Sequence, residues 1–149
     1  MKNKITYKDI VKLQPCYNPS EIGMNEDYSD TIPNFIDEFK DKVKDKEDII
    51  WLICSYQYMT NKDMRLFAVW CAREALKLVK NPDERSVNAC NIAEQFANGE
   101  ATQDELDAAR TAARPAAMDA ARTAAMDAGR AARTAAWAAQ FIHLKTYFG

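Results

Sequence analysis

The side chains best suited to chemistry in this sequence are the arginines of an alanine-rich stretch, residues 107–140. Half of its 34 residues are alanine, and it holds five arginines against three aspartates. A guanidinium group presents a planar fork of donors that can bind a carboxylate or a phosphate through two parallel hydrogen bonds. We therefore predict an anion-binding stripe along a helix, with these candidate binding residues: Arg110, Arg114, Arg122, Arg130 and Arg133.

A plainer interpretation of the same arginines is a solvated helix face. Arg110, Arg122 and Arg130 each follow an aspartate by three residues, the spacing of an intrahelical salt bridge. Such pairs stabilise a helix by only a few tenths of a kcal/mol and need no ligand. Both interpretations stay open from the sequence.

Cysteine and histidine give no pattern typical of catalysis or metal binding. The four cysteines, Cys16, Cys54, Cys71 and Cys90, lie far apart, and His143 is the single histidine. Zinc sites usually use ligands at short spacing, and a Cys–His nucleophile needs a third group to orient it. The sequence therefore predicts no enzyme, no metal and no cofactor. The cysteines are expected to be reduced, mostly buried thiols.

Composition and charge restrict the function further. The 149 residues carry a formal net charge of −2, whereas nucleic-acid binders usually show a basic excess, so direct nucleic-acid binding is not expected. The N-terminus lacks the apolar run of a signal peptide, and charged residues interrupt every candidate membrane span. We expect a cytoplasmic protein that does not bind a membrane.

The first part of the chain combines a short helix with a long loop. Thr6 with Asp9 resembles a capping box that opens a helix over about Tyr7–Leu13. Residues 16–33 are rich in Asn, Pro, Ser, Gly, Asp and Tyr, which predicts a long loop. Long loops are often functional. This loop is the second candidate binding surface, and its candidate residues are Tyr17 and Tyr28.

The middle of the chain, residues 34–98, is predicted to contain helices and no strands. Apolar spacing predicts helices over about 34–44, 49–59, 62–79 and 83–98, the third buried on most sides. Trp51 and Trp70 are expected in the core. Segment 49–59 has strand-like composition but no second strand to pair with, so it is interpreted as a buried helix.

The alanine-rich region, residues 103–147, should form the longest helix. Thr102 and Glu105 make a capping box at its start. Pro115 inside a helix costs about 3 kcal/mol, so we predict a kink or break there that divides the region into about 103–114 and 116–147. Its apolar end should dock on the core. The predicted fold is an all-α, single-domain bundle of about five to seven helices over residues 1–149.

Three segments together resemble a known family. They read ITYKDIVKLQPC, WLICSYQYMTNKDMRLFAVWCAREAL, and ACNIAEQFANGEATQDELDAARTAAR followed by further alanine words. These segments resemble the putative immunity protein family of bacterial genomes and mobile elements. The resemblance implies an all-helical cytosolic protein that neutralises a partner by binding, with no catalytic residues. Pro115 and the methionines among the alanine words depart from the family's usual composition.

Two functional hypotheses follow. The first is a non-catalytic helical protein that neutralises or sequesters a protein partner, either a toxin or a defence effector. The alternative is a phage or mobile-element counter-defence protein that inhibits a defence nuclease or sequesters a small anionic signal. A homo-oligomer formed through the alanine-rich helix or the apolar C-terminal tail is compatible with either hypothesis.

Overall fold

The computed structural model describes residues 1–55, 57–127 and 130–149, and the side chains of residues 119–134 lie outside this description. The described residues form seven helices and one pair of three-residue strands, which confirms the all-α class and the predicted number of helices. The chain divides into two compact units, each described by itself. The first unit combines Met1–Thr60 with Trp137–Gly149, and the second is Asn61–Ala136. The single domain stays a prediction.

The first unit opens with a capped helix, as predicted. Strand β1 (Lys4–Thr6) leads into α1 (Tyr7–Leu13). The Thr6 hydroxyl accepts a hydrogen bond from the backbone N–H of Asp9 at 3.2 Å and donates one to the Asp9 carboxylate at 2.8 Å. The side chain of Lys2 also donates to that carboxylate. The cap therefore satisfies a backbone donor that the first helical turn would otherwise leave without a partner.

Asp9 makes this cap sensitive to acid. Burial raises the pKa of Asp9, but the hydrogen bonds from Lys2 and Thr6 outweigh it and leave that pKa below its ordinary value of 3.8. The carboxylate therefore stabilises the fold above about pH 4, and its contribution is lost as the pH falls through the lowered pKa. We predict that Asp9→Asn reduces the loss of unfolding free energy between pH 7 and pH 3, as measured by urea denaturation. Asp27→Asn, at an exposed position, is the matched control and should reproduce the wild-type difference.

The end of the predicted 16–33 loop contains regular structure that the sequence did not indicate. Strand β2 (Ser29–Thr31) pairs antiparallel with β1, with Ile5 opposite Asp30. Residues 32 and 33 then open α2 (Ile32–Phe39), so the loop prediction is wrong for residues 29–33. Three residues are too few to show the alternating pattern by which strands are recognised.

The core of the first unit gathers around α2 and α3 (Lys46–Ile53). Phe35 and Phe39 are fully buried, with ring centroids 5.4 Å apart. The predicted helix over 49–59 ends early, at Ile53, because residues 54, 55 and 57–59 form bends and turns. Besides the two phenylalanines, the apolar side chains buried in this unit are Ile5, Ile10, Met24, Ile32, Ile36, Val43, Ile49, Leu52, Ile53, Tyr58, Met59, Phe141 and Leu144.

Trp51 corrects a prediction about this core. It was expected to be buried, but 52% of it is exposed. Its neighbours Ile49, Leu52 and Ile53 turn inward and define the buried face of α3, and Trp51 lies on the other face of this short helix. When a helix carries apolar residues on all sides, the sequence has no hydrophobic periodicity that would identify the buried face.

The C-terminal segment packs on this core, as its apolar composition predicted. Helix α7 (Arg130–Lys145) buries Phe141 and Leu144 and leaves Ile142 67% exposed. The Lys145 ammonium group reaches the Asp37 carboxylate on α2 at 2.9 Å, which fixes the end of α7 beside the first half of the chain. Helix α7 also crosses the boundary between the units, since its residues before Trp137 belong to the second.

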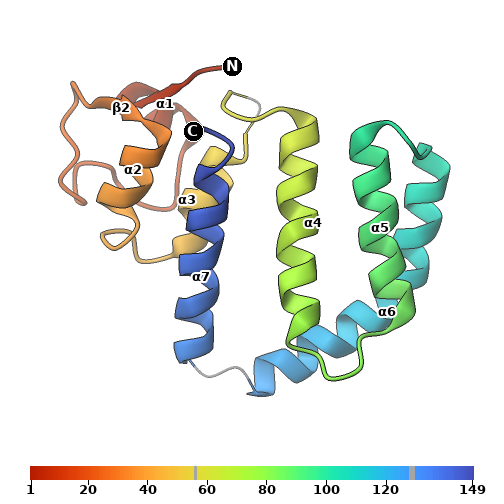
Figure 1. Ribbon diagram of the computed structural model, residues 1–149. Coiled ribbons are helices and arrows are strands. Elements are labelled where there is room, and N and C mark those ends of the chain that lie inside the picture. Colours follow the sequence, from red (N-terminus) through yellow and green to blue (C-terminus); the bar gives the residue numbers. More distant parts are fainter. Residues whose placement is uncertain (56, 128–129) are drawn as a thin grey trace. The chain divides into compact units, whose positions relative to one another are not determined.

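The second unit is built from three helices in sequence, α4 (Asn61–Lys77), α5 (Glu84–Asn98) and α6 (Gln103–Asp127), with the start of α7. Helix α5 packs against both α4 and α6 (Figure 1). Both predicted helix boundaries around residue 100 are confirmed. Gly99 ends α5 at a φ of 80°, a conformation that favours glycine, and the Thr102 backbone N–H donates to the Glu105 carboxylate at 2.7 Å.

Pro115 lies inside α6, which continues from Gln103 to Asp127. The predicted division into helices 103–114 and 116–147 is therefore wrong. Figure 1 shows α6 changing direction between its teal first half and its pale blue second half, so the helix is kinked rather than broken. Loss of one backbone hydrogen bond bends a helix that neighbouring turns still hold together.

Helix α4 is less buried than predicted. Only Phe67 and Val69 of α4 are buried, and Leu78, just beyond its end, is 81% exposed. Helix α4 has two apolar faces. Its contact with α5 covers one side of the helix, and the other face stays partly exposed. The prediction of burial on most sides is wrong.

Candidate functional site

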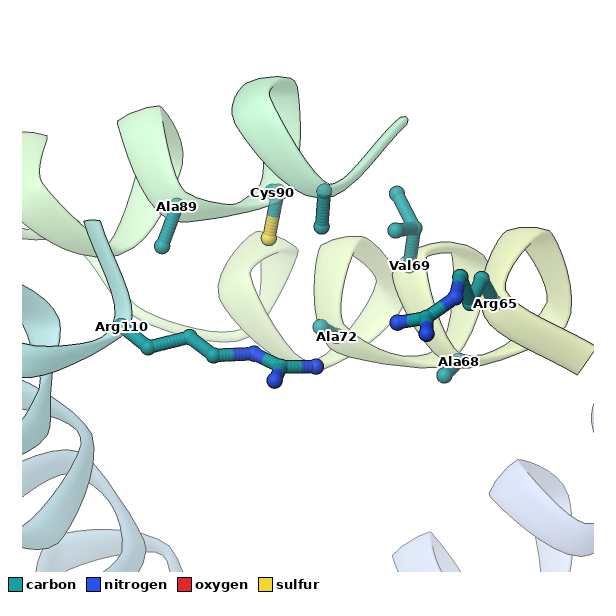
Figure 2. A pocket seen from close by; sticks show the side chains of 8 residues that line it. Arg65, Ala68, Val69, Ala72, Ala89, Cys90 and Arg110 are labelled. Atoms are coloured by element: carbon teal, nitrogen blue, oxygen red, sulfur yellow. The ribbon is translucent and has the colours of Figure 1, made fainter. Parts of the chain in front are cut away.

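A groove of about 220 Å³ is formed by the three helices of the second unit (Figure 2). Helix α4 contributes the most lining residues, followed by α5, and α6 contributes one arginine. The lining residues are Arg65, Ala68, Val69, Ala72, Ala89, Cys90, Ala93 and Arg110. The groove thus has an apolar lining of small side chains and two cationic groups.

The small side chains recur one helical turn apart on both helices. Ala68 and Ala72 are four residues apart on α4, and Ala89 and Ala93 have the same spacing on α5. Residues at this spacing lie on the same face of a helix. Two rows of alanine therefore face the groove, which leaves room there for side chains from another molecule.

Arg65 enters the groove from α4 with its charge oriented by an aromatic ring. Its guanidinium carbon lies 4.7 Å from the centroid of the Phe96 ring. Stacking of this kind holds the guanidinium plane through a cation–π contact and leaves its N–H groups at the edge able to donate. Figure 2 shows the guanidinium groups of Arg65 and Arg110 directed toward one another from opposite ends of the groove.

Arg110 enters from α6 and is exposed. The salt bridge expected from the spacing with Asp107 does not form, and Asp107 accepts a hydrogen bond from the Gln103 amide at 2.9 Å. No ion pair joins Arg65 or Arg110 to a carboxylate within the part of the chain that the structure describes. Both groups are available to an anion from outside.

Three other cations of α4 and α5 are neutralised within the unit. Arg73 bridges to Glu94 at 2.6 Å, and Lys77 pairs with Glu74. Arg85 bridges to Asp83 at 2.7 Å, and that interaction lowers the pKa of Asp83 to about 2. The contrast distinguishes the two groove arginines from these three paired cations.

The remaining predicted arginines are not brought to the groove by the described residues. Arg114 is exposed on α6, one turn beyond Arg110, and does not line the groove. The side chains of Arg122, Arg130 and Arg133 lie outside the described residues. A stripe of five binding arginines stays a prediction, with Arg110 as the member that the structure places in a groove.

The two loop tyrosines are packed rather than presented to solvent. The hydroxyls of Tyr17 and Tyr28 are both buried without a hydrogen-bond partner among the described atoms. Burial, with Asp48 nearby, raises the pKa of Tyr17 to about 12, and burial also raises the pKa of Tyr28. The Tyr28 ring lies edge-on to Phe39, with centroids 5.3 Å apart. This geometry favours a structural role, and the binding role of the loop stays a prediction.

The cysteines do not supply a nucleophile at the groove. Burial raises the pKa of the Cys90 thiol, although Arg73 lowers it, so Cys90 stays protonated near neutral pH. All four cysteines are free, but Cys16 is exposed and Cys54 and Cys71 are only partly buried, so the expectation of mostly buried thiols is wrong. Within the described ranges, no group of three or more His, Cys, Asp or Glu side chains could hold a metal ion.

Sequence reasoning missed Arg65 as a site residue. It lies outside the alanine-rich stretch, and its place opposite Arg110 depends on how α4, α5 and α6 pack. The alanines four residues apart on two consecutive helices were an available signal, since they mark a helix face without large side chains.

The helices that form the groove lie in a region shared with a known family. The profile of the family described as Imm-5 like putative immunity protein matches residues 55–147. The chain belongs to this family. The match contains the whole second unit, and therefore every residue that lines the groove. Searches of curated proteins and of solved structures found no match to the chain.

No helix among the described residues combines the length and the apolar character needed to cross a bilayer.

Proposed function

We propose that this protein is a non-catalytic immunity protein of the cytoplasm that neutralises a toxic partner protein by binding it through the groove of the second unit. Membership of the Imm-5-like family supports the neutralising role. The choice of surface rests on one observation. Arg65 and Arg110 line the same groove, and neither forms an ion pair with a carboxylate of the described residues.

The chemistry of the groove fits binding rather than turnover. It offers two hydrogen-bond forks and an alanine lining, and its one thiol has a raised pKa. General acid–base catalysis needs a group that can exchange a proton near neutral pH, and a guanidinium group does not. Tight capture of a protein surface needs only complementary shape and charge.

A growth assay tests this function. Each gene adjacent to the one that encodes this protein is expressed from an inducible promoter, alone and together with the protein. We predict that one neighbouring product arrests growth and that co-expression of the wild-type protein restores it. Arg65→Glu with Arg110→Glu should abolish the protection, because both forks are replaced by like charges that repel the same anion.

Arg114→Glu is the matched control, since it makes a charge reversal on an exposed α6 residue outside the groove. Circular dichroism and cellular protein levels must be unchanged in all variants for the comparison to count. If the wild-type protein does not restore growth in the presence of either neighbouring gene product, the proposed function is wrong. If the double variant protects fully, the function stands and the groove is the wrong surface.

A further inference from the structure

We infer that the groove receives an α-helix of the toxic partner, with an Asp or Glu side chain placed between Arg65 and Arg110 and small or apolar residues against the alanine rows. This inference rests on the proposed function and specifies the chemistry of the partner's surface. Three features carry it: unpaired charge, the spacing of the alanines, and the size of the groove.

The charge selects an acidic group. Arg65 and Arg110 converge from α4 and α6 on one space, and neither has a carboxylate partner in the described chain (Figure 2). Two nearby guanidinium groups repel each other, and a carboxylate between them removes that repulsion while accepting several charge-assisted hydrogen bonds. Arg65 is already oriented over Phe96, so part of the entropy cost of ordering its side chain is met before the partner arrives.

The alanine rows select a helix. Helices pack by placing the ridges of one into the grooves of the other, at an axial distance of about 8–10 Å that small side chains make shorter. Ala68 and Ala72 on α4, with Ala89 and Ala93 on α5, form rows with the period of one helical turn. A partner helix with apolar residues at positions i and i+4 would place them against these rows, in the helix-in-groove mode of recognition.

The size of the groove argues against a small-molecule ligand. Pockets for drug-sized ligands enclose roughly 300–1,000 Å³ and bury most of the ligand. This groove has about 220 Å³, and the side chain of Arg110 at its edge is exposed. It accommodates one or two side chains of a larger surface better than it would enclose a nucleotide.

Binding measurements with the purified full-length protein test the inference, and the probe is the purified product of the adjacent gene that arrests growth. Arg65→Ala and Arg110→Ala should each weaken binding about tenfold, as expected for the loss of one member of a partly solvated charge pair. Arg65→Lys should fall between the alanine variant and wild type, since it keeps the charge but loses the fork and the stacking. Arg114→Ala, outside the groove, should bind as wild type does.

Hydrogen–deuterium exchange of the complex locates the contact on both proteins. We expect protection in α4 and α5 of this protein and in one helix of the toxin. Glu→Gln or Asp→Asn on that helix should weaken binding as much as Arg110→Ala does, and Arg110→Glu combined with an acid-to-Arg change on the toxin should recover it. This charge exchange also keeps the test informative if Arg65→Ala fails to fold.

Each other outcome has a defined meaning. Binding that Arg65→Ala and Arg110→Ala leave unchanged overturns this inference and leaves the proposed function standing, whereas no binding by wild type overturns both. Competition by inorganic phosphate, beyond that of chloride at equal ionic strength, would assign the groove to a small anion. A dimer of this protein that Arg110→Ala dissociates would assign it to a second copy. Either result overturns the inference.

Discussion

Replacing Phe39 with alanine should lower the free energy of unfolding by about 3–5 kcal/mol, the range for removing a large aromatic side chain from a core. Phe39 is fully buried, and its ring contacts both Tyr28 and Phe35, with centroids 5.3 and 5.4 Å away. The Lys42 ammonium group also lies 4.6 Å from the ring centroid. The variant would lose all of these contacts and leave a cavity.

Trp51→Ala is the control for this prediction, because it removes a larger side chain from α3 of the same unit. With 52% of Trp51 exposed, its replacement should cost less than about 1 kcal/mol. Urea denaturation followed by circular dichroism measures both variants. Equal losses in the two variants would contradict the burial that the structure assigns to them, and would favour the core position that the sequence suggested for Trp51.

Leu144→Ala should destabilise the first unit by about 2–5 kcal/mol, the range for truncating a fully buried leucine. Leu144 is 0% exposed, although it lies only five residues before Gly149. Its burial depends on α7 packing against the N-terminal part of the chain, where Lys145 also pairs with Asp37. Amide exchange in α2 should therefore accelerate in the variant, as well as exchange in α7 itself.

Ile142→Ala is the matched control for Leu144→Ala, since it shortens an apolar side chain of similar size two residues away. Ile142 is 67% exposed, so its loss should change stability by no more than about 0.5 kcal/mol. A large effect from Ile142 together with a small one from Leu144 would mean that α7 packs with a different face toward the core.

The fold was predictable wherever the chain carries local signals that neighbours do not override. Thr6 with Asp9, and Thr102 with Glu105, form the hydrogen bonds that their spacing indicated. Gly99 ends α5 in the left-handed conformation expected of a glycine at that place. Capping and turn chemistry depend on residues within one helical turn, so a sequence specifies them directly.

The features that the sequence did not predict depend on which distant segments meet. Strand β2 exists because β1 lies beside it, and three residues carry no period of their own. The exposure of Trp51 depends on which face of α3 meets the core. Arg65 and Arg110 are far apart in sequence and share a groove only through the packing of α4, α5 and α6. Arg110 could therefore be predicted from its local sequence, whereas the contribution of Arg65 to the site could not.

The division of the first unit between the two ends of the chain has a consequence for synthesis. A ribosome makes the whole of the second unit before it makes Phe141 and Leu144, which the first unit needs to complete its core. Chains are made at about 5–20 residues per second, far more slowly than helices form. Helices α4 and α5 can therefore fold on the nascent chain before Phe141 and Leu144 are available to the core that contains Phe35 and Phe39.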